Sequence, residues 1–227
     1  MDKLGSAISQ KLNVETVFRI GPFPVSESVV ISWVVIAVFF LLVLVLTRNM
    51  SVMNPSRRQI AVESFVEWIR NLIVSMTGEN GACYWEYLAT VLLYIGLSNM
   101  VGIFGLKSPT KDINVSGCLA VMSIILVEAA GIRHRGAGGW LKSFTKPIAI
   151  ITPINILEIF IRPLSLCMRL FGNVLGAFII MEMIKLVLPV VAPALLSLYF
   201  DLFDGLIQAY VFVFLTSLYI REAVEDE

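Results

Sequence analysis

Long apolar stretches alternate with short polar segments along most of this chain, beginning near residue 29. A transmembrane helix needs about 20 apolar residues to cross ~30 Å of hydrocarbon. Three of the stretches have roughly this length and end at charged or turn-forming residues. They predict membrane-spanning helices at residues 29–47, 84–106 and 115–132.

Residues 55–77 follow a different pattern. Their apolar side chains recur at helical spacing, while arginines and glutamates occupy the other side. A helix with one apolar and one charged face lies in the interface between membrane and water. We therefore predict an interfacial amphipathic helix here rather than a span.

The last two apolar stretches, residues 154–188 and 194–221, are longer than a perpendicular span requires. At a rise of about 1.5 Å per residue, they form helices of roughly 52 and 42 Å. Only steep tilt fits such helices into a bilayer. Pro189 and Pro193 mark the turn between them, and Pro163 is a candidate bend. These features predict a long, strongly tilted helical hairpin.

Composition agrees with a membrane protein. The 227 residues are 58% hydrophobic and only 15% charged, whereas soluble domains carry about 25% charged residues. We predict an all-α polytopic membrane protein in which residues 29–227 form a single membrane domain and residues 1–28 an external tail. The 17 basic residues balance the 17 acidic ones, which argues against nucleic acid as a partner.

The positions of the basic residues predict the orientation. They cluster at 48–58 and in a polar, glycine-rich loop at 133–146. Lys and Arg in short loops favour the cytoplasmic side. Both loops and the C-terminus are therefore expected in the cytoplasm, and the N-terminus and Lys111 outside.

No signature of enzyme chemistry is visible. His134 is the single histidine, and the three cysteines lack metal-ligand spacing. The glycine-rich nucleotide motifs and the nucleophile elbow do not occur. We expect no metal site, no cofactor and no enzymatic activity of the chain on its own.

Arg169 is the most informative residue, because it lies within an otherwise largely apolar run. A charge at membrane depth costs at least ~2.5 kcal/mol, and the guanidinium pKa, above ~12, prevents it from shedding its proton. No acidic residue lies within one helical turn of Arg169. Its partner is therefore expected on another subunit.

The remaining polar residues of the predicted hairpin fall on distinct faces. On a wheel of about 100° per residue, Glu182 lies roughly 140° from Arg169. The polar residues on the side of Arg169 are Glu158, Arg162, Ser165 and Asn173. Two polar faces suit two separate aqueous approaches kept apart by an arginine.

In the last helix, Asp201, Asp204 and Gln208 are spaced by three and four residues, which predicts one face. Intramembrane carboxylates are functional candidates. Plainer interpretations stay open: the two aspartates could be solvated near the membrane surface, and Glu182 could simply pair with Lys185.

The sequence RLFGN at 169–173, preceded by PINILEIFIRPLSL and followed by LIQAYVFVFLTSLYI at 206–220, resembles subunit a of F-type ATP synthases. The resemblance extends over about residues 28–222. It implies a proton-translocating subunit, with sodium as a possible ion. The implied partners are a c-subunit ring, the b-subunit peripheral stalk, other ATP synthase subunits and the lipid bilayer. The implied location is a bacterial plasma membrane rather than a thylakoid.

The resemblance also implies residue roles. Arg169 matches the arginine that faces the carboxylate of the c-ring and blocks leakage between two offset half-channels, so that proton flow drives rotation and ATP synthesis. Asn173 and Gln208 match residues of the external half-channel, and Glu158, with Ser165 nearby, lies on the cytoplasmic half-channel.

One position departs from the family pattern. Many members carry Glu or His nine residues after the arginine, where this chain has Phe178. Asp201 matches a position that carries His or an acid in other members. We expect Asp201 and Glu182 to serve the external half-channel in this chain.

A secondary transporter or ion channel that binds an anionic solute at Arg169 is the alternative function. It predicts an inverted repeat of the hairpin, and no second half resembling RLFGN is present.

Overall fold

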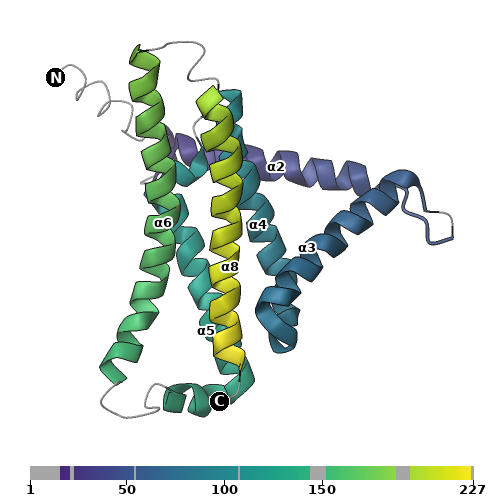
Figure 1. Ribbon diagram of the computed structural model, residues 1–227, viewed down its shortest axis with the longest axis vertical. Helices are drawn as coiled ribbons and strands as arrows, with labels where there is room; N and C mark the ends of the chain where they lie inside the picture. Colours follow the sequence, from purple (N-terminus) through teal and green to yellow (C-terminus); the bar gives the residue numbers. More distant parts are fainter. Residues whose placement is uncertain are drawn as a thin grey trace.

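A computed structural model describes residues 16–20, 23–53, 55–106, 108–143, 152–187 and 195–225. Five helical stretches in it are long and apolar enough to cross a membrane. The chain is thus an all-α polytopic membrane protein, and the predicted fold class is confirmed. Figure 1 shows four long helices, α4, α5, α6 and α8, running along one another, with α2 extending across their direction.

Two short strands lie within the described part of the predicted N-terminal tail. Strands β1 (Thr16–Ile20) and β2 (Phe23–Ser26) pair antiparallel. Helix α2 (Glu27–Thr47) follows at once. Glu27 lies in its first turn, where a carboxylate stabilises the positive end of the helix dipole. Most side chains of α2 are exposed and apolar, as a surface in contact with lipid requires.

Helix α3 (Arg57–Gly81) begins at Ser56, whose hydroxyl oxygen accepts a hydrogen bond from the Gln59 backbone N–H at 3.3 Å. Gly78 interrupts it with φ of 74°, a conformation that glycine adopts without strain. One turn, η1 (Ala82–Tyr84), then leads into α4 (Trp85–Met100) and η2 (Val101–Phe104). The apolar residues of α3 divide between an exposed side and the core; those exposed are Ile60, Phe65, Val66 and Trp68.

The third predicted span is part of a longer helix than expected. The turn η3 (Pro109–Lys111) precedes α5, which spans Ile113–Ser143. The predicted loop after residue 132 was therefore wrong in part. Helix α5 bends at Gly136, with φ of 72°, and then resumes. Trp140 holds this last portion against the main helix by donating a hydrogen bond to Glu128 Oε2 at 2.8 Å.

Helix α6 (Thr152–Val187) is continuous through Pro163, and a rise of about 1.5 Å per residue makes it roughly 54 Å long. The π-helical segment η5 (Leu198–Asp204) leads into α8 (Gly205–Val224). Helix α6 packs mainly against α5, whereas α8 packs against α3, α4 and α5. The two hairpin helices are thus held largely through α5 rather than by direct contact. The predicted proline turn between them lies outside the described residues.

Helix α2 differs in direction from the two hairpin helices. Figure 1 shows α2 running across the direction of α6 and α8. The core lies where α3, α4, α5 and α8 meet; its fully buried members include Ile73, Leu88, Ile95, Ala130 and Ile220.

Candidate functional site

Arg169 lies in the middle of α6 and is half-buried. Within the described part of the chain it forms neither an ion pair nor a hydrogen bond. A guanidinium carries five donors and a permanent charge. It is therefore a cation whose partner is not among the described residues.

The side of α6 that carries Arg169 is open. On a helical wheel, Asn173, Gly172 and Gly176 lie within about 60° of Arg169. Asn173 is exposed, and a Cβ added at either glycine would meet nothing within 4 Å. Small residues four apart allow another helix to approach closely. This open face, Arg169 with Gly172, Asn173 and Gly176, can accept a helix from another chain.

Two further residues predicted for the half-channels, Ser165 and Gln208, are partly or largely buried. Ser165 is half-buried on α6, one turn before the arginine. Gln208 on α8 is only 8% exposed. Its side chain does not line the pocket formed by the neighbouring aspartates.

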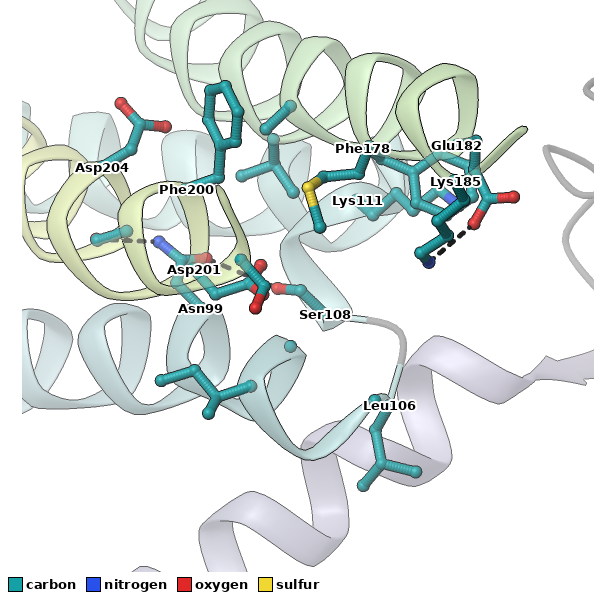
Figure 2. Close-up of a pocket in the computed structure, with 18 residues that line it drawn as sticks. Asn99, Leu106, Ser108, Lys111, Phe178, Glu182, Lys185, Phe200, Asp201 and Asp204 are labelled. Carbon is teal, nitrogen blue, oxygen red and sulfur yellow. Dashed lines mark hydrogen bonds and ion pairs between the residues drawn. The ribbon is translucent and has the colours of Figure 1, made fainter. Parts of the chain in front are cut away.

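A pocket of about 630 Å³ lies at one end of α6. It is bounded by α6, η3, η5 and the end of α4, and Figure 2 shows charged side chains gathering around it. Those that line it are Lys111, Glu182, Lys185, Asp201 and Asp204. We call it the acidic pocket, because its three carboxylates outnumber its two ammonium groups.

The backbone around Asp201 is adapted to the acidic pocket. A Cβ placed on Gly102 would lie 2.5 Å from Asp201 Oδ1, so the carboxylate packs directly on the glycine. The predicted α-helical stripe was wrong here, because residues 198–204 form a π-helix, whose wider turn changes the angular spacing. Asp201 and Asp204 both face the pocket, whereas Gln208 does not.

A buried hydrogen-bond network holds this end together. Asn99 Nδ2 donates to the Gly205 carbonyl oxygen at 3.0 Å, which ties α4 to the start of α8. Thr110 Oγ1 donates to Asn99 Oδ1 at 2.6 Å, and Ser108 Oγ donates to the Ser98 carbonyl oxygen at 3.0 Å. Through Asn99, these bonds connect η3 to the first residue of α8. The sequence analysis did not select Asn99 or Thr110; polar residues at the end of an apolar run were the available signal.

Glu182 combines two of the roles considered for it. Its carboxylate pairs with Lys185 Nζ at 3.0 Å, so the predicted i,i+3 pair forms. Yet the glutamate side chain is only 12% exposed and lines the acidic pocket, whereas the lysine is half-exposed. Pairing at the rim therefore coexists with a position inside the pocket, on the side of α6 away from Glu158.

Lys111 was not selected as a functional residue, because its segment was interpreted as a turn. Its Nζ is buried and lies 2.8 Å from the ring centroid of Phe178. Phe178, the position that departs from the family pattern, thus faces an ammonium group from η3. The sequence separation of the two residues hides this contact.

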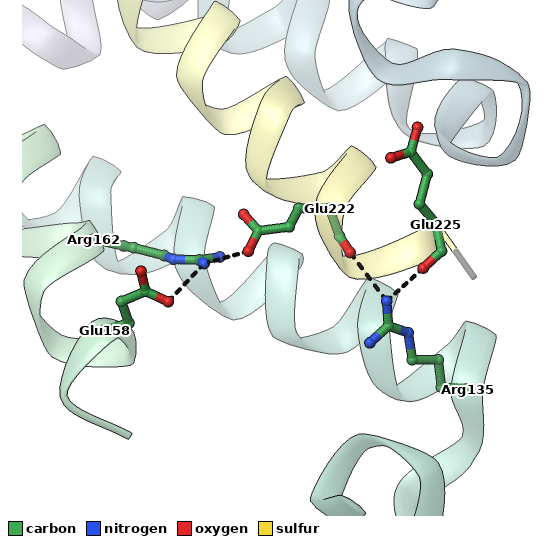
Figure 3. Close-up of polar contacts among 5 residues, drawn as sticks. All are labelled: Arg135, Glu158, Arg162, Glu222 and Glu225. Atoms are coloured by element: carbon green, nitrogen blue, oxygen red, sulfur yellow. Dashed lines mark hydrogen bonds and ion pairs between the residues drawn. The ribbon is translucent and has the colours of Figure 1, made fainter. Parts of the chain in front are cut away.

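The opposite end of α6 is closed by ion pairs. Arg162 Nη2 lies 3.0 Å from Glu158 Oε2 and 2.8 Å from Glu222 Oε1, and its guanidinium covers the ring of Tyr219. Arg135 donates to the carbonyl oxygens of Glu222 and Glu225 at the end of α8. Figure 3 shows these contacts joining three helices.

We call this cluster of Arg135, Glu158, Arg162 and Glu222 the clasp. Glu158, predicted for the cytoplasmic half-channel, is part of it and is exposed. Glu222 was not selected from the sequence, although an acid at the end of an apolar helix was a visible signal. From Glu158 to Glu182, α6 rises roughly 36 Å at its helical pitch, so the clasp and the acidic pocket lie at opposite ends.

Comparison with known proteins gives consistent matches. The profile of the ATP synthase A chain family matches residues 29–221. ATP synthase subunit a of Moorella thermoacetica is 33% identical over 209 residues, which cover 92% of this chain and 95% of that protein. The sodium ion specific ATP synthase subunit a of Propionigenium modestum is 30% identical over 220 residues, 90% of this chain and 76% of that protein. ATP synthase subunit a 2 of a Bradyrhizobium species is 33% identical over 218 residues, 95% of this chain and 96% of that protein.

Proposed function

The chain belongs to the ATP synthase A chain family, and we propose that it forms two offset proton half-channels against a ring of c subunits. In this proposal Arg169 pairs with the carboxylate of each passing c subunit. The half-channels pass protons to and from that carboxylate, and the flow drives rotation and ATP synthesis. The chain itself carries out no catalysis.

One observation carries the proposal: Arg169 is a permanent cation without an ionic partner among the described residues, on an open face of α6. A carboxylate supplied by another subunit would satisfy its charge. Both α6 and α8 also carry exposed apolar side chains, as a surface between helices in a membrane requires; they include Leu164, Met168, Leu206, Tyr210 and Phe214.

The acidic pocket supports a role in proton uptake from outside. Glu182 and Asp201 bring two carboxylates into one cavity, and carboxylates can accept and release protons. Asn173 and Gln208 are proposed to continue this path towards the ring. A protonated ring carboxylate is neutral and tolerates lipid, so it can move away from Arg169.

Glu158 and Ser165 are proposed to serve release on the cytoplasmic side. Glu158 is exposed and pairs with Arg162 at 3.0 Å, and a carboxylate in contact with water can accept and release a proton. A membrane potential supplies about 2.3 kcal/mol per charge for each 100 mV, which biases the direction of rotation. The proposed location is a bacterial plasma membrane, with the N-terminus outside and the C-terminus in the cytoplasm. The b-subunit peripheral stalk is a further proposed partner.

Substitution of Arg169 tests the proposal. Arg169→Ala should abolish ATP-driven proton pumping in vesicles that contain the reconstituted complex, while the complex still assembles. Arg169→Lys should also lose most coupling, because a compact ammonium lacks the planar fork of a guanidinium. Arg57→Ala, an exposed arginine at the start of α3, is the matched control and should pump normally. Normal pumping by Arg169→Ala would refute the proposal.

A further inference from the structure

Lys111 places a positive charge inside the acidic pocket that the proton path described above does not use. Its Nζ is buried and covers the ring of Phe178 at 2.8 Å from the centroid. Burial removes the hydration of an ammonium group, so the surroundings must replace it. The face of an aromatic ring and nearby carboxylates both stabilise a cation. The pocket supplies both.

Charged groups of both signs lie on the elements that pack against η3 or line the same pocket. The groups are Glu182 and Lys185 on α6, Asp201 and Asp204 on η5, Glu27 on α2, and Asp112 beside η3 itself. Carboxylates outnumber ammonium groups among them.

We propose that Lys111 is a positioning residue of the uptake path: its fixed positive charge keeps the carboxylates of the acidic pocket ionised and ready to accept protons. This inference rests on the proposed function. Lys111 lines the same cavity as Asp201 and Glu182. An opposite charge nearby favours the ionised form of a carboxylate, and screening by salt is weak for buried groups. Without the charge, Asp201 and Glu182 would hold a proton more tightly and pass it on more slowly.

The inference predicts a change in the pH profile of uptake. Membrane sectors with Lys111→Met, Lys111→Gln or Lys111→Arg are reconstituted into sodium-free vesicles, and a potassium diffusion potential drives protons through the external half-channel. Uptake fails at high external pH, when the pocket carboxylates find no proton. The Met and Gln variants bind protons more tightly, so the external pH that halves conduction should rise by about one unit. Their maximal rate should fall severalfold. Lys111→Arg retains the charge and should keep the wild-type midpoint.

Lys185→Met is the matched comparison, because it removes a lysine charge from the rim of the same pocket. Lys185 Nζ lies 3.0 Å from Glu182 Oε1 and its side chain is half-exposed, so its removal should also raise the midpoint, by the amount that solvent screening leaves. Copurification of the membrane sector with each variant confirms assembly before conduction is measured.

The outcomes separate this inference from the function on which it rests. If wild type conducts but the Met and Gln variants keep its midpoint, Lys111 has no such role, while the proposed function stands. Equal shifts for Lys111→Arg and Lys111→Met would also refute the inference, because a retained charge would then have no effect. If the wild-type membrane sector conducts no protons, the proposed function itself fails.

Discussion

The acidic pocket and the clasp are both clusters of charged residues, but they use charge in opposite ways. In the clasp, each arginine contacts its acceptors directly, at 2.5–3.1 Å, and joins α5, α6 and α8. In the acidic pocket, five charged side chains surround a cavity of about 630 Å³. The first arrangement fastens helices together, whereas the second leaves room for water between titratable groups.

This difference indicates which carboxylates are available for proton transfer. Glu158 is held in place by its ion pair with Arg162. Asp201 rests on Gly102 and faces the cavity, and it forms no ion pair with an arginine among the described residues. Glu182 is intermediate, because its carboxylate pairs with Lys185 and also lines the acidic pocket. We therefore expect the loss of carboxylates to affect proton transfer more in the acidic pocket than in the clasp.

Neutralising both pocket acids should have the largest effect. Asp201→Asn combined with Glu182→Gln should lower passive proton conduction by at least about tenfold, in the range of a lost acid–base group. Each single change should cost less, since the other carboxylate remains. Passive proton conduction is measured with the reconstituted membrane sector of each variant. Unchanged conduction in the double variant would mean that protons enter elsewhere.

Filling the space beside Asp201 should give a smaller effect without removing any charge. A Cβ in Gly102→Ala would lie 2.5 Å from the carboxylate, which must then move. We expect proton conduction to fall about threefold, equivalent to roughly 0.7 kcal/mol. Gly138→Ala is the control, since nothing lies within 4 Å of its Cβ position. Equal conduction in the two variants would show that the position of Asp201 is not critical.

Breaking the clasp should affect stability more than transport. Arg162→Met leaves Glu158 and Glu222 without their shared guanidinium. Because both glutamates are about half-exposed, solvent limits the cost to about 1–3 kcal/mol. Thermal unfolding of the purified membrane sector should begin several degrees lower, with conduction reduced no more than about twofold. Arg57→Ala, outside the clasp, should unfold like wild type. A transport loss as large as that of the double pocket variant would remove the distinction between the two ends.

Labelling with an impermeant thiol reagent should show on which side of the membrane the acidic pocket and the clasp lie. We expect no effect of the introduced cysteines on transport. Single cysteines are introduced as Met53→Cys, Gly138→Cys and Ile113→Cys, in a background without the native cysteines. All three positions are exposed, whereas Thr110, beside Lys111, is fully buried. In intact cells only the Ile113 variant should react, because basic loops favour the cytoplasm. Reaction at Met53 or Gly138 would reverse the orientation and exchange the proposed uptake and release ends.

The sequence was sufficient to predict the fold class and to select Arg169 as the leading candidate residue. Apolar length and helical periodicity are local properties, so the helices were predictable, and so was the i,i+3 pair of Glu182 with Lys185. Arg169 was recognisable because a permanent charge in an apolar run is costly wherever the helix lies. The combination of RLFGN with the last apolar helix was enough to suggest the family, which the profile match over residues 29–221 then confirmed.

Tertiary structure decided how the two ends of α6 differ. Lys111 meets Phe178, and Glu222 meets Arg162, across separations that helical periodicity cannot bridge. The π-helical turn at 198–204 and the bend at Gly136 depend on packing and on a single left-handed residue. The sequence determined which residues carry charge at membrane depth. Only the folded chain determined which of those charges are paired and which surround a cavity, because pairing depends on distances between helices rather than on spacing within one.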